Sequence, residues 1–200
     1  MEQHIRFNDD YSGRYEFSMD YAMMKGFMDA AAEEGGESPT SLLDEMNVDS
    51  IVDVLNARSG ISNASIAEVS EGKLIIGYDF NNIETLNLSM QDDAMSSMLQ
   101  GAGGDAGMGG SPSSGASITK KGKKITYSTG DMTDVADAED LEGMGSMMTF
   151  NVKMTFPREI KKVKNKDAEI SADGKSVTVS ANFEELLNGD KKPGMQVKLK

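Results

Sequence analysis

The architecture is set by residues 147–187, which read MMTFNVKMTFPREIKKVKNKDAEISADGKSVTVSANFEELL. Apolar and polar side chains alternate from 148 to 156, which predicts a strand with one buried face. Pro157 ends or bends that strand, because proline cannot donate a ladder hydrogen bond. Two shorter alternating runs flank the Asp-Gly pair at 173 and 174, a pair typical of a hairpin turn. The segment therefore predicts strand, proline break, strand, turn and strand.

A short helix and a last strand follow. Asn182 stands three residues before Glu185, the spacing of a capping box at the start of a helix. The expected helix runs through Leu187 and is stopped by Gly189, since glycine favours the position after a helix. Residues 195–199 alternate again and predict a final strand.

The first part of the chain contains both strand-like and helix-like patterns. Alternation on both sides of a polar turn predicts a hairpin, and apolar residues three or four apart predict helices. The expected elements are a hairpin at 5–19, a helix at 21–34, either one helix at 39–55 or two divided at 47–49, strands at 61–69 and 73–80, a helix from 83 to about 99, and one strand at 118–129. The glycine- and serine-rich run at 101–117 cannot bury apolar surface, so we expect a flexible insertion at about 100–117.

Together these elements predict an α+β fold. Successive hairpins predict an antiparallel β-sheet, and the amphipathic helices between them predict a layer packed on one face of that sheet. A chain of 200 residues is long enough to bury its own core. We expect residues 1–200 to form a single α+β domain that contains the flexible insertion.

The chain is strongly acidic, and its charge is unevenly distributed. The net charge is −13 at pH 7. Residues 1–116 hold 5 basic and 20 acidic side chains, giving −15, whereas residues 117–200 hold 15 basic and 13 acidic ones, giving +2. Nucleic acid and anionic lipid repel such a chain as a whole, so we expect no nucleic-acid partner. The lysines near 120 and 160 are expected on solvated strands and turns.

Residue types suited to catalysis or metal binding are sparse. The chain has no Cys, which excludes disulfides and thiolate chemistry. His4 is the single histidine, and its place on the polar side of the first strand predicts an exposed side chain without a catalytic or metal-binding role. The polar turn at 8–13 resembles the start of a calcium loop, but Met19 stands where that loop needs a bidentate Glu. We expect no catalytic residue, no bound metal and no cofactor.

Methionine supplies much of the apolar volume, with 16 Met against an aromatic content of 6%. Met23, Met24, Phe27 and Met28 recur at helical spacing within the expected helix 21–34. This face either packs in the core or lines a groove, because methionine-rich surfaces adapt to varied apolar ligands. We take these four residues as the candidate ligand-binding site, between helix and sheet, for a lipid or another apolar or amphipathic ligand.

Three stretches of the chain resemble the LppM-like domains of bacterial envelope lipoproteins. They are HIRFNDDYSGRYEFSMD at 4–20, KLIIGYDFNNIETLN at 73–87 and MTFPREIKKVKNKDAEISADGKSVTVSANFEELL at 154–187. The resemblance spans most of the chain apart from the glycine-rich insertion. It implies an exported domain that is tethered in its native form by an N-terminal lipidated cysteine. We expect membrane contact only through such an anchor, with Met1 standing where that cysteine would be.

The resemblance also implies a function in the cell envelope, in the periplasm or at the surface. One branch of that family has been linked to envelope lipid binding, so non-enzymatic binding of a lipid or glycolipid is the leading hypothesis. A structural or protein–protein interaction module, with another envelope protein as partner, is the first alternative. A carboxylate-dependent hydrolase is the second, since 33 acidic residues are present, although nothing in the sequence places two of them in one apolar pocket.

Overall fold

The computed structural model describes residues 1–20, 48–70, 72–91, 115–129, 149–188 and 190–200. The strands are β1 (Glu2–Phe7), β2 (Gly13–Asp20), β3 (Ile61–Ser70), β4 (Lys73–Phe80), β5 (Ser117–Lys121), β6 (Lys124–Ser128), β7 (Thr149–Thr155), β8 (Ile160–Lys164), β9 (Ala168–Ile170), β10 (Ser176–Asn182) and β11 (Met195–Leu199). The helices are α3 (Val48–Asn56), α4 (Ile83–Gln91) and α6 (Phe183–Leu187). No helix in this described part of the chain has the length and apolar composition needed to cross a bilayer.

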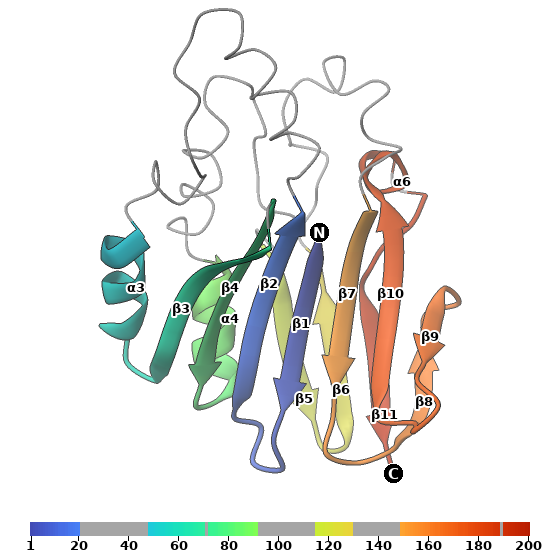
Figure 1. The fold of residues 1–200 in the computed structure, drawn as a ribbon. Coiled ribbons are helices and arrows are strands. Elements are labelled where there is room, and N and C mark those ends of the chain that lie inside the picture. The colour runs from blue at the N-terminus through green and yellow to red at the C-terminus, as the bar shows by residue number, and fades with distance from the viewer. Residues whose placement is uncertain (21–47, 71, 92–114, 130–148, 189) are drawn as a thin grey trace, which may run out of the picture.

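The described strands form two sheets, one in front of the other in Figure 1. The larger sheet has seven strands in the order β3-β4-β2-β1-β7-β10-β9, and the smaller has four in the order β5-β6-β11-β8. Buried side chains of both sheets form one cluster, which includes Ile5 and Val152 from the larger sheet and Ile125 and Val197 from the smaller. The fold is therefore mixed α+β, with most of the described elements being strands.

The expected covering of the larger sheet, a layer of helices alone, is wrong. The sequence predicts a single sheet covered by helices, whereas a second sheet provides most of this cover among the described residues. Alternation shows that a strand has a buried face, but it does not show whether a helix or another sheet lies against that face. Helix α4 continues the layer beside β5, where Asn87 donates to the carbonyl O of Ile118 at 2.8 Å and accepts from its N–H at 2.7 Å.

A parallel pair, β1 with β7, lies in the middle of the larger sheet. Ile5 is opposite Met154 in this pair, and the α-amino group of Met1 donates a hydrogen bond of 2.8 Å to the carbonyl O of Thr149. The other strand pairings are antiparallel. The expectation of a wholly antiparallel sheet is therefore wrong at this pair. Two strands joined by a tight hairpin turn must be antiparallel, but β1 and β7 are far apart in the chain and are free to pair in parallel.

The core is built from the alternating positions that the sequence predicts. In β7 the side chains of Phe150, Val152 and Met154 are buried, while the residues between them face outward. The ring of Phe7 stacks on that of Phe156 with centroids 5.5 Å apart. Several methionines also pack in this core, as the flexible thioether side chain allows. The buried ones among the described residues are Met19, Met90, Met154 and Met195.

Residues 117–128 form a hairpin, not the single strand that the sequence predicts. Lys121 pairs with Lys124 across a two-residue loop, and Gly122 at the first loop position has φ +60°. A positive φ at that position is the pattern of a type II′ turn, for which glycine is favoured. Strand β8 is a second element absent from the prediction, because its run of lysines hides the alternation.

The C-terminal elements agree with their sequence signals. The side chain of Asn182 accepts a hydrogen bond of 2.7 Å from the N–H of Glu185, whose carboxylate accepts one of 2.9 Å from the N–H of Asn182. This is the predicted capping box at the start of α6. Strands β3, β4, β10 and β11 also occupy their predicted places, and helix α4 begins at its predicted residue.

Several predictions fall on residues outside the described ranges. The candidate ligand-binding residues Met23, Met24, Phe27 and Met28 are among them, as is the whole helix predicted at 21–34. Residues 92–114, which include most of the glycine-rich insertion, also lie outside. These assignments stay predictions.

Candidate functional site: the polar face of the larger sheet

The outward face of the larger sheet carries two neighbouring rows of polar side chains that run across the strands. Within the described residues, no helix or strand covers this face (Figure 1). The strand register places Gly77, Glu16, His4, Lys153, Thr178 and Glu169 side by side in the first row. The second row holds Asp79, Arg14, Arg6, Thr155 and Ser176. We call these two rows the polar face.

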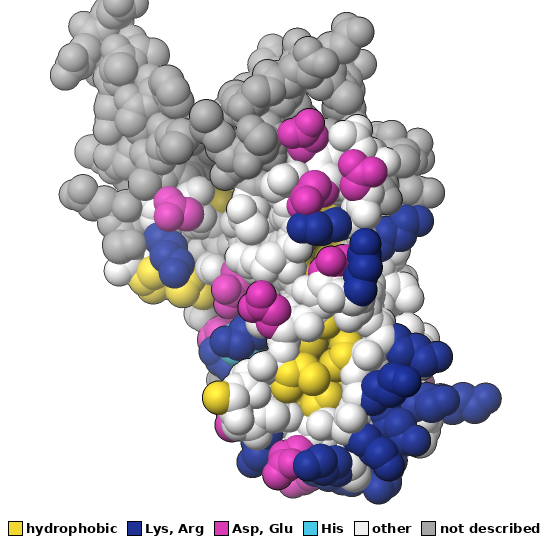
Figure 2. Space-filling view, turned by 90° about the vertical axis from the view of Figure 1, so that its right-hand side faces the viewer, with side chains coloured by type: hydrophobic (Ala, Val, Ile, Leu, Met, Phe, Trp, Pro, Cys, Tyr) yellow, Lys and Arg dark blue, Asp and Glu magenta, His cyan; other side chains and the backbone are white. Residues whose placement is uncertain are grey.

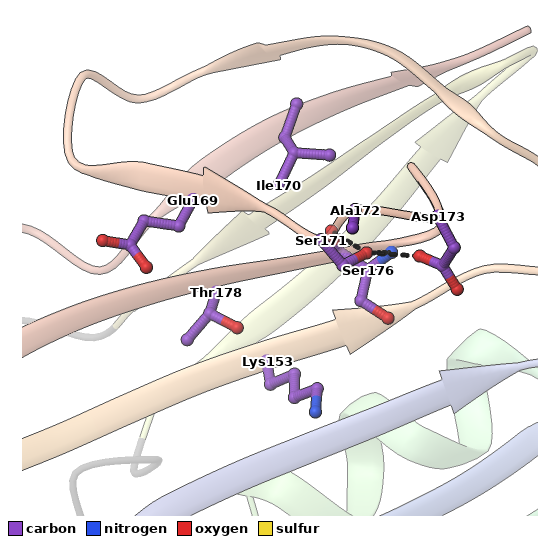
Figure 3. A pocket seen from close by; sticks show the side chains of 8 residues that line it. All are labelled: Lys153, Glu169, Ile170, Ser171, Ala172, Asp173, Ser176 and Thr178. Carbon is purple, nitrogen blue, oxygen red and sulfur yellow. Dashed lines mark hydrogen bonds between the residues drawn. The ribbon is translucent and has the colours of Figure 1, made fainter.

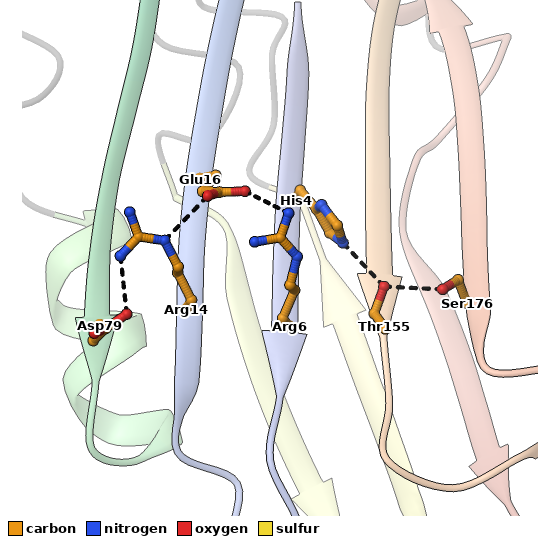
Figure 4. Close-up of polar contacts among 7 residues, drawn as sticks. All are labelled: His4, Arg6, Arg14, Glu16, Asp79, Thr155 and Ser176. Atoms are coloured by element: carbon orange, nitrogen blue, oxygen red, sulfur yellow. Dashed lines mark hydrogen bonds and ion pairs between the residues drawn. The ribbon is translucent and has the colours of Figure 1, made fainter. Parts of the chain in front are cut away.

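One half of the polar face is a chain of ion pairs (Figure 4). The Arg14 guanidinium lies 3.0 Å from Asp79 Oδ1 and 3.0 Å from Glu16 Oε1. Glu16 Oε2 lies 2.7 Å from Nη2 of Arg6. Burial alone would raise the pKa of Glu16, but the hydrogen bonds from Arg14 and Arg6 outweigh it and lower the pKa below its ordinary value. Glu16 therefore stays an anion held between two guanidinium groups.

Gly77 gives the Arg14 side chain the space to lie along the sheet. A Cβ atom at position 77 would stand 2.9 Å from Nη2 of Arg14, so a larger residue would make the end of this flexible side chain shift. Glycine in the interior of a strand often marks such a close approach. The ion pairs are partly exposed and contribute little to stability, but they fix the direction of two guanidinium groups.

The other half of the polar face is a line of hydrogen bonds. His4 Nε2 and Thr155 Oγ1 share a hydrogen bond of 2.9 Å, and Thr155 Oγ1 lies 2.9 Å from Ser176 Oγ (Figure 4). His4 is half-buried, so the prediction of an exposed His4 is wrong: its strand lies in the middle of the sheet, between two neighbours. This burial, helped by the charges of Arg6 and Lys153, lowers the pKa of His4 to about 4. The imidazole is therefore neutral at neutral pH.

A shallow pocket of about 470 Å³ lies where the polar face meets the β9–β10 turn (Figure 3). Its lining residues are Lys153, Glu169, Ile170, Ser171, Ala172, Asp173, Ser176 and Thr178. Thr178 of β10 is opposite Lys153 on one side and Glu169 on the other. A cationic donor, a hydroxyl group and a carboxylate acceptor therefore stand next to one another on three neighbouring strands.

The turn beside this pocket is held rigidly by its own side chains. Oδ1 of Asp173 accepts hydrogen bonds from the Ser171 hydroxyl at 2.5 Å and from the Lys175 N–H at 3.0 Å. These hydrogen bonds lower the pKa of Asp173 below its ordinary value, and the bond from Ser171 has the largest effect. Gly174 has φ +66°, a conformation that glycine adopts without strain. The pocket wall is therefore formed before any ligand arrives.

Sequence reasoning did not find the pocket residues. Alternation predicts that Lys153 and Thr178 lie on the polar sides of their strands. It does not predict the order of the strands in the sheet. Glu169 lies on a strand of only three residues. Within the described residues, no three His, Cys, Asp or Glu side chains lie close enough together to hold a metal ion.

Comparison with known proteins gives one structural similarity to report. No protein-family model and no curated protein matches the chain. The structure is similar to the folded domain of LppM from Mycobacterium tuberculosis, determined by NMR, with 13% sequence identity and a TM-score of 0.46. The match covers 100% of this chain and 87% of that one.

Proposed function

We propose that the chain is a non-catalytic ligand-binding domain of the bacterial cell envelope, and that its polar face binds the sugar-bearing head group of a glycolipid. The observation that carries this proposal is the row formed by Lys153, Thr178 and Glu169 in the floor of the pocket. The envelope location rests on the sequence resemblance to LppM-like domains. The ligand class rests on the chemistry of the pocket.

The row matches the hydrogen-bonding needs of a sugar. Each sugar hydroxyl both donates and accepts, so a site for neighbouring hydroxyls needs donors and acceptors in alternation. The ammonium group of Lys153 only donates, the Glu169 carboxylate only accepts, and the Thr178 hydroxyl does both. The volume of about 470 Å³ falls within the range of ligand pockets.

The geometry around His4 favours binding over catalysis. A hydroxyl next to an imidazole, as in Thr155 and His4, is the arrangement of a nucleophile and its base. A pKa of about 4, however, makes His4 a weak base at neutral pH. Strands β1 and β7 each have a neighbour on both sides, so their N–H groups are used in the sheet ladders. Those backbone N–H groups are therefore not free to stabilise a developing oxyanion beside Thr155.

The apolar part of such a ligand is assigned by the sequence to Met23, Met24, Phe27 and Met28. We keep this assignment as a separate part of the proposal, because the described residues carry only the polar part. The two parts are testable independently, through the sugar and through the acyl chain.

The test is a chemical-shift titration of the ¹⁵N-labelled chain. The probes are an alkyl glycoside below its micelle concentration and an alkyl phosphocholine with the same tail and no sugar. We expect the glycoside to shift the amides of β7, β9 and β10, and the double variant Lys153→Gln/Glu169→Gln to remove those shifts. Ser180→Ala, an exposed residue on β10 outside the pocket, is the matched control and should keep them.

Equal shifts from both probes at β7, β9 and β10 would overturn the sugar assignment, because the tail alone would then explain them. Shifts that survive in the double variant would overturn the site. The variant Met23→Ser/Met24→Ser separately tests the apolar part, and should weaken both probes alike if the acyl chain binds there.

A further inference from the structure

The outward face of the smaller sheet carries a row of four lysines. The register pairs Lys121 of β5 with Lys124 of β6, Lys124 with Lys198 of β11, and Lys198 with Lys162 of β8. Directly paired residues point to the same side of a sheet. All four are exposed, while their neighbours Ile125 and Val197 are buried. We call these four residues the lysine row.

The surroundings of the lysine row are also basic. The four strands contain seven lysines, two in β5, one in β6, three in β8 and one in β11, and no acidic residue. In the next row, Thr119, Thr126 and Gln196 are uncharged and Lys164 is basic. Within the described residues, no carboxylate forms an ion pair with any member of the lysine row.

This arrangement is unfavourable for the isolated sheet. Like charges placed directly opposite each other on neighbouring strands destabilise the pair. The chain as a whole has 33 acidic against 20 basic residues, so carboxylates are abundant elsewhere. Four lysines in register therefore gain a favourable partner only from outside the described residues.

We propose that the lysine row docks this domain on the anionic surface of a lipid bilayer. The face of a sheet is broad, which matches a plane of phosphate groups. Neighbouring strands are about 4.8 Å apart, so the row extends over about 14 Å. Lysine meets phosphate as a mobile point charge, and it suits a fluid array of head groups that offers no fixed geometry.

The charge distribution of the molecule supports the same orientation. A net charge of −13 repels an anionic membrane, so approach is favourable only with the basic face leading. Figure 2 shows Lys and Arg side chains gathered along the side of the β8–β9 edge, next to an apolar patch. Ile170 of β9, at 48% exposed, is a large apolar side chain of this edge. This contact is additional to the lipid anchor implied by the sequence resemblance.

The test is co-sedimentation of the full chain with vesicles. The probes are pure phosphatidylcholine vesicles and vesicles in which one third of the lipid is phosphatidylglycerol. We expect binding to the anionic vesicles alone, falling steeply as salt rises. Each lysine near such a surface strengthens binding about fivefold, so Lys124→Gln/Lys198→Gln should bind about 30-fold more weakly.

The matched control is Lys73→Gln/Lys192→Gln, which removes the same charge at exposed positions off the row and should bind like the parent. Thermal melting separates docking from folding, because Lys124→Gln/Lys198→Gln relieves repulsion and should melt at the same temperature or higher. Equal losses in both double variants would overturn the proposal, since net charge would then explain binding. Absence of binding to anionic vesicles at low salt would overturn it too, as would salt-sensitive binding to a DNA duplex in its place.

Discussion

The phenol of Tyr127 donates a hydrogen bond of 2.7 Å to Oε1 of Gln3, and this bond joins the two sheets across the core. Gln3 is fully buried, and its Nε2 donates to the sulfur of Met90 at 3.4 Å. Burial raises the pKa of Tyr127, so the phenol remains a donor throughout the physiological range. The amide of Gln3 is thereby satisfied by one partner from the smaller sheet and one from α4.

Removing this phenol should be costly. Tyr127→Phe leaves Oε1 of Gln3 buried without that donor, and we expect the free energy of unfolding to fall by about 1–3 kcal/mol. Urea unfolding at neutral pH measures the change. In the double variant Tyr127→Phe/Gln3→Met both polar groups are replaced, so most of the loss should be regained. A parent and a Tyr127→Phe variant of equal stability would show that the bond contributes nothing.

The stability of the domain should depend on pH through His4. Its pKa is about 4 in the folded protein against 6.5 for the ordinary group, so the unfolded chain binds more protons between these values. The contribution of neutral His4 is therefore complete above about pH 6.5 and is lost as the pH falls toward 4. NMR titration of the ring protons should give a midpoint near 4.

The control for this prediction is His4→Gln, which keeps a hydrogen-bonding group beside Thr155 and removes the titration. Parent and variant should lose different amounts of stability between pH 7 and pH 5, the parent losing more. Parallel pH profiles for the two proteins would contradict the assignment to His4.

The contribution of the Asn182 cap of α6 to the free energy of unfolding should be measurable without altering the core. Asn182→Ala removes the acceptor for the Glu185 N–H and should lower the free energy of unfolding by about 1 kcal/mol. Asn182→Ser keeps an oxygen at the cap and should retain most of the stability. Chemical denaturation of the three proteins distinguishes these outcomes, and equal losses for Ala and Ser would point to a role other than capping.

Position 122, in the turn between β5 and β6, should tolerate Asn better than Val. A Cβ atom at Gly122 would meet no atom within 4 Å, so only the backbone conformation at φ +60° opposes substitution. Gly122→Val should cost about 1–2 kcal/mol, because a β-branched residue is strained there. Gly122→Asn should cost clearly less, since Asn adopts a positive φ more readily. Melting temperatures that do not separate the two variants would contradict this.

The sequence predicts single elements better than it predicts their neighbours. Alternation located β7 within one residue, and the spacing of Asn182 and Glu185 located the start of α6, because both signals are local. The order of the strands is set by contacts far apart in the chain, such as that of Ile5 with Met154, and no local pattern encodes it. The hairpin at Gly122 was missed because flanking lysines mask a two-residue loop.

Because strand order depends on contacts far apart in the chain, the sequence also does not predict parts of the candidate site. His4 was recognised as a polar-side residue, but its half-burial depends on β7 lying beside β1. Lys153 and Glu169 come together only through the pairing of β10 with both of its neighbours. The lysine row has the same origin, since its four members come from four strands.

The parallel pairing of β1 with β7 also determines when the domain can form during synthesis. In the described part of the chain, β7 follows β1 only after five intervening strands and the helices between them, so the strand that completes the far side of β1 is synthesised long after β1 itself. Until then one side of β1 offers unpaired N–H and C=O groups to any other extended segment. Until β7 is made, β1 is therefore an unpaired edge strand of the β1–β2 hairpin. A partner that covers this edge would protect the growing chain from aggregation.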